Sequence, residues 1–197
     1  MKTAAIFPYG AGSGYQGRAC GPETTKILEK TFALVRTLRG TKCTIYLGDG
    51  IDPQNPSAPP LKEIMEKYLV NEFKQGLIKV LGREVPFIMP DIVLAKEEAW
   101  GTIAVSIAIA KELEARGITE CYLVSSWDHL PRIVYTWYKM RAFSIYLTYV
   151  DPRLTKRLLR EPIELVRTVF SLGKHIPKFK RKKIAENSSV SLQVVST

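Results

Sequence analysis

The sequence lacks any long hydrophobic run. A membrane-spanning helix needs roughly 18 or more consecutive apolar residues, and no stretch of this 197-residue chain approaches that length. The apolar run that begins at Ala4 ends at Pro8 after four residues, whereas the apolar region of a secretory signal spans about 7–15 residues. We therefore expect no spanning helix and no secretory signal, and we expect the protein in the cytoplasm.

Cysteine and histidine are also scarce. The chain has an odd number of cysteines, and Cys20, Cys43 and Cys121 show no Cys-x-x-Cys spacing. This pattern favours a reduced cytosolic protein over one cross-linked by disulfides. The two histidines, His129 and His175, have no cysteine or carboxylate at the spacing of a metal site. The sequence therefore predicts no bound metal.

Positive charge is concentrated near one end of the chain. The formal net charge is +10, yet residues 1–152 contain eighteen Lys and Arg against sixteen Asp and Glu. Between Arg153 and Lys183, eleven Lys and Arg face two Glu, so that this segment has a net charge of +9. A chain of this size with 46% hydrophobic residues can bury one core plus an appendage. We predict a domain over 1–152, a basic helical extension over 153–183 and a frayed tail over 184–197.

Short apolar runs alternate with stretches of helical periodicity up to residue 150. The predicted strands cover Ala4–Tyr9, Cys43–Leu47, Asp91–Ala95, Cys121–Val124 and Ser144–Val150. The predicted helices cover Pro22–Arg39, Leu61–Leu81, Thr102–Arg116 and Ile133–Met140. Continuous apolar strands joined through helices favour a parallel sheet that is covered on both faces. We predict a doubly wound, Rossmann-like α/β domain with about five mostly parallel strands.

Polar residues follow the predicted strands. In a doubly wound sheet, ligands bind in the crevice beyond the carboxyl ends of the strands. The expected ligand-binding residues there are Gly10, Gly12, Gly14, Asp49, Gly101, Thr102, Ser125, Ser126 and Arg132. The run from Ser125 to Arg132 is the richest, because it places two hydroxyls, a carboxylate, an imidazole and a guanidinium in eight residues. We predict that this run forms one wall of a small-molecule site.

The glycine-rich connection after the first strand matches the dinucleotide fingerprint only in form. Gly12-x-Gly14-x-x-Gly17 has the required spacing, but Pro22 puts the helix start after the last glycine. The nearest acidic residue at the end of the second strand, Asp49, lies 32 residues past Gly17 instead of about 20. Backbone N–H groups ahead of a helix still favour an anion such as phosphate. The alternative is a flexible surface loop.

His129 is the first expected catalytic residue, as an acid or a base. Its position in the first turn of a helix favours a neutral imidazole; the alternative is a histidine that only caps the turn. Arg132 follows on the same helix face and is the expected anion clamp. Thr102 is predicted to cap its helix. Glu97 is the second catalytic candidate, with binding of a ligand hydroxyl or pairing with Arg132 as its expected roles, unless it lies in a solvated turn.

These connections resemble those of a bacterial family of unknown function that includes YdcF, SanA and ElyC. The resembling pieces, in the same order over roughly residues 4–150, are the first glycine turn, Gly48-Asp49-Gly50, Gly101-Thr102 and Ser125-Ser126-x-x-His129-x-x-Arg132. The chain departs from the family where an acidic residue is replaced by Lys96, next to Glu97. The resemblance implies a Rossmann-like fold and a nucleotide-like or phosphorylated ligand, with S-adenosylmethionine as one candidate. It also implies a link to cell-envelope biogenesis, but no defined reaction.

The basic extension suggests a function of a different class. Arg153–Leu172 carries an apolar stripe at helical spacing and predicts one amphipathic helix, or two that are broken near Pro162. Together with the cluster at Lys178–Lys183, such a helix can attach to an anionic membrane surface or to nucleic acid. The cluster has no recognisable nucleic-acid motif, so peripheral membrane contact is favoured and specific nucleic-acid binding is not expected. The alternative is a helix that packs on the sheet, followed by a solubilising tail.

Overall fold

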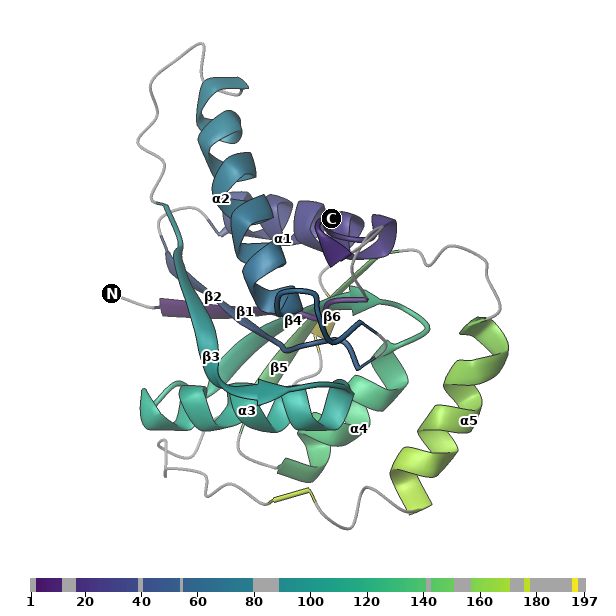
Figure 1. The fold of residues 1–197 in the computed structure, drawn as a ribbon. Coiled ribbons are helices and arrows are strands. Elements are labelled where there is room, and N and C mark those ends of the chain that lie inside the picture. Colours follow the sequence, from purple (N-terminus) through teal and green to yellow (C-terminus); the bar gives the residue numbers. More distant parts are fainter. Residues whose placement is uncertain are drawn as a thin grey trace, which may run out of the picture.

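Five parallel strands form one sheet, and a two-residue sixth strand adds to its edge (Figure 1). The strands are β1 (Thr3–Pro8), β2 (Lys42–Asp49), β3 (Asp91–Ala99), β4 (Glu120–Ser126), β5 (Ser144–Val150) and β6 (Gln193–Val194). They lie in the order β3-β2-β1-β4-β5-β6. This computed structural model describes residues 3–11, 17–38, 41–53, 55–79, 89–140, 143–150, 157–170, 176–177 and 193–194.

Helices cover both faces of the sheet, which confirms the predicted doubly wound α/β fold. The helices are α1 (Pro22–Thr37), α2 (Leu61–Lys79), α3 (Thr102–Ala115), α4 (Leu130–Met140) and α5 (Arg157–Phe170). One face is covered by α1 and α2 and the other by α3 and α4, while α5 packs on α4 at the outside (Figure 1). Neighbouring strand residues point to opposite faces. Ile6 therefore packs in the core under α1 and α2, whereas Phe7 and Tyr9 pack under α3 and α4.

The strand order reverses next to β1, which lies at the centre of the sheet. From β1 the chain moves outward through β2 to β3, and it then returns across the sheet to β4 on the other side of β1. The connections that follow β1 and β4 lead to helices on opposite faces. In open α/β sheets, ligands bind beyond the strand ends at such a switch point, so the fold directs attention to the ends of β1 and β4.

The predicted end of β3 was wrong. β3 does not end at Ala95 but runs to Ala99, so Glu97 lies in a strand and not in a connection. The strand continues because it resumes pairing with β2 after a register shift, and Gly50 N then donates to the carbonyl oxygen of Ala99 at 2.7 Å. Of the two predicted arrangements for the extension, the structure has the single helix: α5 continues through Pro162.

The C-terminal predictions are only partly covered by the described residues. The basic cluster at 178–183 lies outside them. Of the predicted tail at 184–197, Gln193–Val194 is described, and it pairs in parallel with β5 as β6. Among the described residues, no helix combines the length and the apolar content needed to cross a membrane.

Candidate functional site

The ends of β1 and β4 lie side by side at the switch point. Tyr9 N donates to the carbonyl oxygen of Val124 at 2.9 Å, so the residues that follow each strand start from adjacent positions. Ser125 and Ser126 are both buried at the end of β4, and the carbonyl oxygen of Ser126 accepts a hydrogen bond from His129 N at 3.1 Å. The backbone therefore turns sharply after β4 and places His129 directly before α4.

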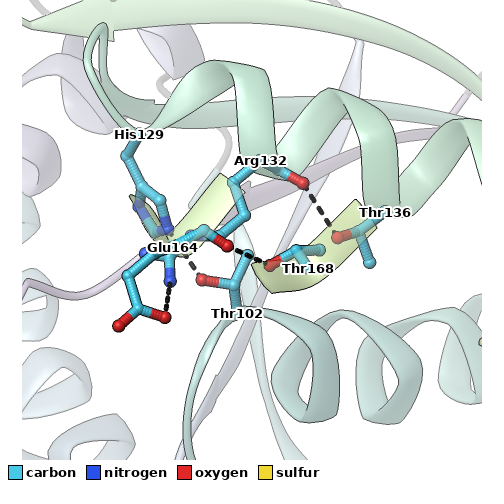
Figure 2. A network of polar contacts seen from close by, with 6 residues as sticks. All are labelled: Thr102, His129, Arg132, Thr136, Glu164 and Thr168. Atoms are coloured by element: carbon cyan, nitrogen blue, oxygen red, sulfur yellow. Dashed lines mark hydrogen bonds and ion pairs between the residues drawn. The ribbon is translucent and has the colours of Figure 1, made fainter. Parts of the chain in front are cut away.

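His129 has a hydroxyl group at each ring nitrogen. Its Nε2 lies 2.7 Å from Thr102 Oγ1, and its Nδ1 lies 3.3 Å from Ser125 Oγ. Figure 2 shows the imidazole extending from the start of α4 toward Thr102. The ring also lies in a T-shaped arrangement with Tyr9, with ring centroids 5.7 Å apart. A neutral imidazole has one donor and one acceptor nitrogen, so in that state one hydroxyl donates to the ring and the other accepts from it.

A buried chain of hydrogen bonds supports Thr102 from within the core. Trp137 Nε1 donates to the Tyr9 hydroxyl, which lies 2.5 Å from Ser106 Oγ. Ser106 Oγ donates to the carbonyl oxygen of Thr102 at 2.6 Å, so the hydrogen between Tyr9 and Ser106 comes from Tyr9. Burial raises the pKa of Tyr9 far above its usual value, which keeps the phenol neutral. These hydrogen bonds hold the first turn of α3 in place, and with it Thr102.

The first turn of α3 begins at a glycine without a side-chain cap. Gly101 has a φ of 85°, a conformation that glycine adopts readily, and a side chain there would meet no atom within 4 Å. Thr102 was predicted as the cap, but Gly101 occupies the cap position without a side-chain hydrogen bond, and Thr102 is the first helical residue. The hydroxyl of Thr102 contacts His129 instead. The first N–H groups of a helix carry partial positive charge and suit an anion.

Arg132, the predicted anion clamp, extends toward α5. Its Nη1 lies 3.9 Å from Glu164 Oε2, and the two side chains are 19% and 22% exposed. Figure 2 shows this pair beside the contact between His129 and Thr102. The predicted pairing of Arg132 with Glu97 was therefore wrong, because Arg132 faces Glu164 and Glu97 pairs with Lys111. The guanidinium instead joins α4 to α5 at the edge of the site.

Asp49 and Gly10 come together on the other face of the sheet, under α2. Gly10 N donates to Asp49 Oδ2 at 3.0 Å. Burial raises the pKa of Asp49 from 3.8 to about 7, against the smaller lowering effect of the Gly10 hydrogen bond. A Cβ at Gly10 would lie 2.7 Å from Leu61 Cδ2 and 3.0 Å from the carboxylate, so a side chain at this position would require Leu61 and Asp49 to shift.

The remaining predicted site residues lie apart from His129 or outside the described residues. Glu97 pairs with Lys111 at 2.6 Å, and both side chains are about half exposed. Its neighbour Glu98 pairs with the buried Lys62, whose Nζ also donates to the carbonyl oxygen of Ala95 at 2.9 Å. Gly12 and Gly14 lie outside the described residues. The structure therefore brings Thr102, Ser125 and His129 together, but not Glu97.

Three residues of the site are not identified by the sequence analysis: Tyr9, Ser106 and Trp137. Tyr9 and Trp137 look like ordinary core residues, and the hydrogen bond between them joins positions 128 residues apart. Ser106 offers the one usable signal, a small polar residue one helical turn after Thr102 in an apolar stretch. In the described part of the chain, no group of three or more His, Cys, Asp or Glu residues could hold a metal ion.

No protein-family model, curated protein or solved structure matches this chain. The resemblance to the YdcF-like family therefore stands on the four sequence pieces that carry it. The chemistry of the site is inferred from the contacts of His129, Thr102, Ser125 and Asp49.

Proposed function

We propose that the protein binds a small phosphorylated or nucleotide-like molecule at the switch point between β1 and β4. The observation that carries this proposal is the 2.7 Å contact between His129 Nε2 and Thr102 Oγ1. This contact joins the residue before α4 to the first residue of α3, at the edge where α/β sheets bind ligands. Phosphate is the favoured chemistry, because the uncapped amides of α3 begin at the same place.

The same pair would act as the acid/base element if the ligand is also a substrate. Thr102 Oγ–H can donate to Nε2 while Nδ1–H donates to Ser125, so Nε2 is the nitrogen that would accept a proton, from the Thr102 hydroxyl or from a ligand hydroxyl that takes its place. Ser125 would keep the ring in this orientation, the role that a third group plays beside a histidine base. We assign His129 the proton-transfer role and Thr102 the role of its hydrogen-bonding partner.

The wider context of the proposal comes from the sequence. The resemblance to the YdcF-like family makes S-adenosylmethionine one candidate ligand and an envelope-related activity one candidate process. The three cysteines of the chain, Cys20, Cys43 and Cys121, are all free thiols, which fits a role in the reducing cytoplasm. The ligand itself has to be found by experiment.

A thermal-shift screen of nucleotides, S-adenosylmethionine and sugar phosphates tests the proposal. A ligand at about 100 times its Kd should stabilise the fold by about 2.7 kcal/mol, which raises the Tm of a chain of this size by about 5–10 °C. His129→Gln and Thr102→Val should each reduce this shift strongly. Thr31→Val is the matched control, because Thr31 is also a buried helical threonine, but its hydroxyl donates to Ile27 in α1.

The control separates binding from stability. Thr31→Val is expected to lower the Tm of the free protein and to leave the ligand-induced shift unchanged. If no compound of the three classes shifts the wild-type Tm, the proposed ligand class is wrong. If a ligand shifts wild type and both site variants equally, the ligand binds elsewhere and the His129–Thr102 contact is only structural.

A further inference from the structure

The outer side of α5 exposes large apolar side chains. Ile163 is 68% exposed, Val166 57% and Phe170 73%. Residues three and four positions apart share one helix face, so these three form a continuous stripe, here called the outer stripe of α5. Single exposed apolar residues are common on protein surfaces, but an aligned apolar face on a helix marks a contact surface.

The opposite side of α5 is the one that packs on the domain. Glu164 meets Arg132 of α4, and Thr168 is buried with 1% exposure. The hydroxyl of Tyr135 in α4 also donates to the carbonyl oxygen of Val169 at 3.4 Å. Figure 1 shows α5 outside α4, away from the sheet. Packing on the domain therefore uses the other face and leaves the outer stripe exposed.

Basic residues flank the positions of the outer stripe in the sequence of α5. Arg167 is exposed one turn after Ile163, and Arg160 precedes Ile163 by about one turn along the helix. Glu164, one of the two acidic residues in the sequence of the helix, faces Arg132 and is 22% exposed. The segment from Arg153 to Lys183, which contains α5, has a net charge of +9. An apolar face with basic residues around it is typical of a helix that lies in the plane of a membrane interface.

We infer that α5 binds the surface of an anionic phospholipid bilayer through Ile163, Val166 and Phe170. The basic residues draw the helix to the negative surface, and the three apolar side chains then enter the boundary between headgroups and acyl chains. A second copy of the chain is a poorer occupant, because two such segments would bring like charges together. Binding to nucleic acid would use the basic residues, but it would not require an exposed apolar stripe.

Lipid binding by α5 would also place the switch point near the membrane. The inner side of α5 contacts Arg132, one turn after His129. A helix is about 10–12 Å across, so a bound α5 would hold the start of α4 roughly one helix diameter from the lipid. Lipid binding by α5 does not require the proposed ligand site, and a different measurement tests it.

Co-sedimentation of the full chain with lipid vesicles tests the inference. The probes are vesicles of phosphatidylserine with phosphatidylcholine and vesicles of phosphatidylcholine alone, each at low and high salt. The wild-type chain should sediment with the anionic vesicles and less so at high salt, because salt screens the attraction. The triple variant Ile163→Ser, Val166→Ser and Phe170→Ser should partition at least roughly a hundredfold more weakly, since each apolar side chain leaving water contributes on the order of tenfold.

Tyr138→Ser is the matched control, because Tyr138 is 64% exposed on the neighbouring α4 and lies off the stripe. This variant should sediment as wild type does. Circular dichroism should show the same Tm for all three proteins, since none of the changed side chains is buried.

The inference would be overturned if the wild-type chain stayed in solution with anionic vesicles. It would also be overturned if the triple variant bound these vesicles as well as wild type does. A dimer that forms through the stripe would also overturn it, if analytical ultracentrifugation finds one in the wild type and only monomer in the triple variant. Binding to duplex DNA but not to vesicles would assign the basic segment to nucleic acid instead.

Discussion

At the carboxyl ends of the strands, the two faces of the sheet contain different kinds of buried polar group. Under α3 and α4, the polar atoms of Tyr9, Ser106 and Thr102 are linked in one neutral chain of hydrogen bonds. Under α2, Asp49 is a buried carboxylate, and in the described residues its one hydrogen bond comes from Gly10 N. The first arrangement holds residues in position without charge, and the second holds a group that titrates near neutrality.

The two arrangements have different consequences for stability. A buried polar group is stable when its hydrogen-bonding capacity is satisfied, whereas a buried charge is costly unless it is paired. The neutral chain is therefore expected to contribute rigidity at every pH. Asp49 is expected to make stability depend on pH and to respond to a ligand that changes its environment.

The largest expected effect is that of Asp49→Asn. Because the folded pKa is raised from 3.8 to about 7, the unfolded chain releases this proton first as the pH rises, so the contribution of Asp49 to stability is present below about pH 4 and lost by about pH 7. Asparagine keeps an acceptor for Gly10 and carries no charge. Above pH 7 the variant should be more stable than wild type by up to roughly 4 kcal/mol.

Urea unfolding at a series of pH values measures this effect. Wild type should lose stability relative to Asp49→Asn between about pH 4 and pH 7. Parallel stability curves for the two proteins would show that Asp49 does not titrate in this range.

Tyr9→Phe should have the next largest effect, on the neutral side of the comparison. Without the hydroxyl, the buried Trp137 Nε1–H loses its acceptor and Ser106 loses its donor. A buried group left without its partner costs about 1–3 kcal/mol, so we expect a loss of about 2–3 kcal/mol in the free energy of unfolding. The loss should be the same at acidic and neutral pH, unlike that of Asp49.

Tyr122→Phe is the control for this prediction. Tyr122 stacks on Tyr146 at 4.7 Å between ring centroids, and this contact needs no hydroxyl. Its loss should stay within about 0.5 kcal/mol, as for changes away from buried networks. Equal losses for the two tyrosines would mean that the hydrogen-bond chain contributes nothing specific.

A smaller effect is expected from Thr102→Val. The substitution removes the hydroxyl at His129 Nε2 but keeps the shape of the side chain, so it should cost about 1 kcal/mol. Nitrogen NMR of the imidazole should report a changed tautomer balance, because Ser125 is then the remaining hydroxyl of the pair. An unchanged spectrum would mean that the contact with Thr102 does not set the tautomer.

The smallest effect is expected from Glu164→Gln. The ion pair with Arg132 is long, at 3.9 Å, and both side chains are partly exposed, so its removal should cost less than about 1 kcal/mol. Thermal unfolding at low and high salt measures this change. A loss several times larger would show that α5 is held mainly by this pair.

The type and order of the elements were predictable because they depend on short stretches of sequence. Apolar runs and helical periodicity identified β1, β2, β4 and β5 and the start of each helix from α1 to α3. The end of β3 was missed, because Glu97 and its neighbours are charged, and a polar strand end has no hydrophobic period to detect. The sequence located Ser125 and His129 at the end of a predicted strand, but it did not show which side chains they contact.

The sequence by itself determined a doubly wound fold and a polar switch-point edge, because hydrophobic periodicity and turn residues act over a few positions. Only the tertiary structure decided the partners: Thr102 for His129, Glu164 for Arg132, and the burial that raises the pKa of Asp49. It also decided that Ile163, Val166 and Phe170 face outward. The physical reason is that partner choice and desolvation depend on which elements pack together, and no local pattern encodes those distances.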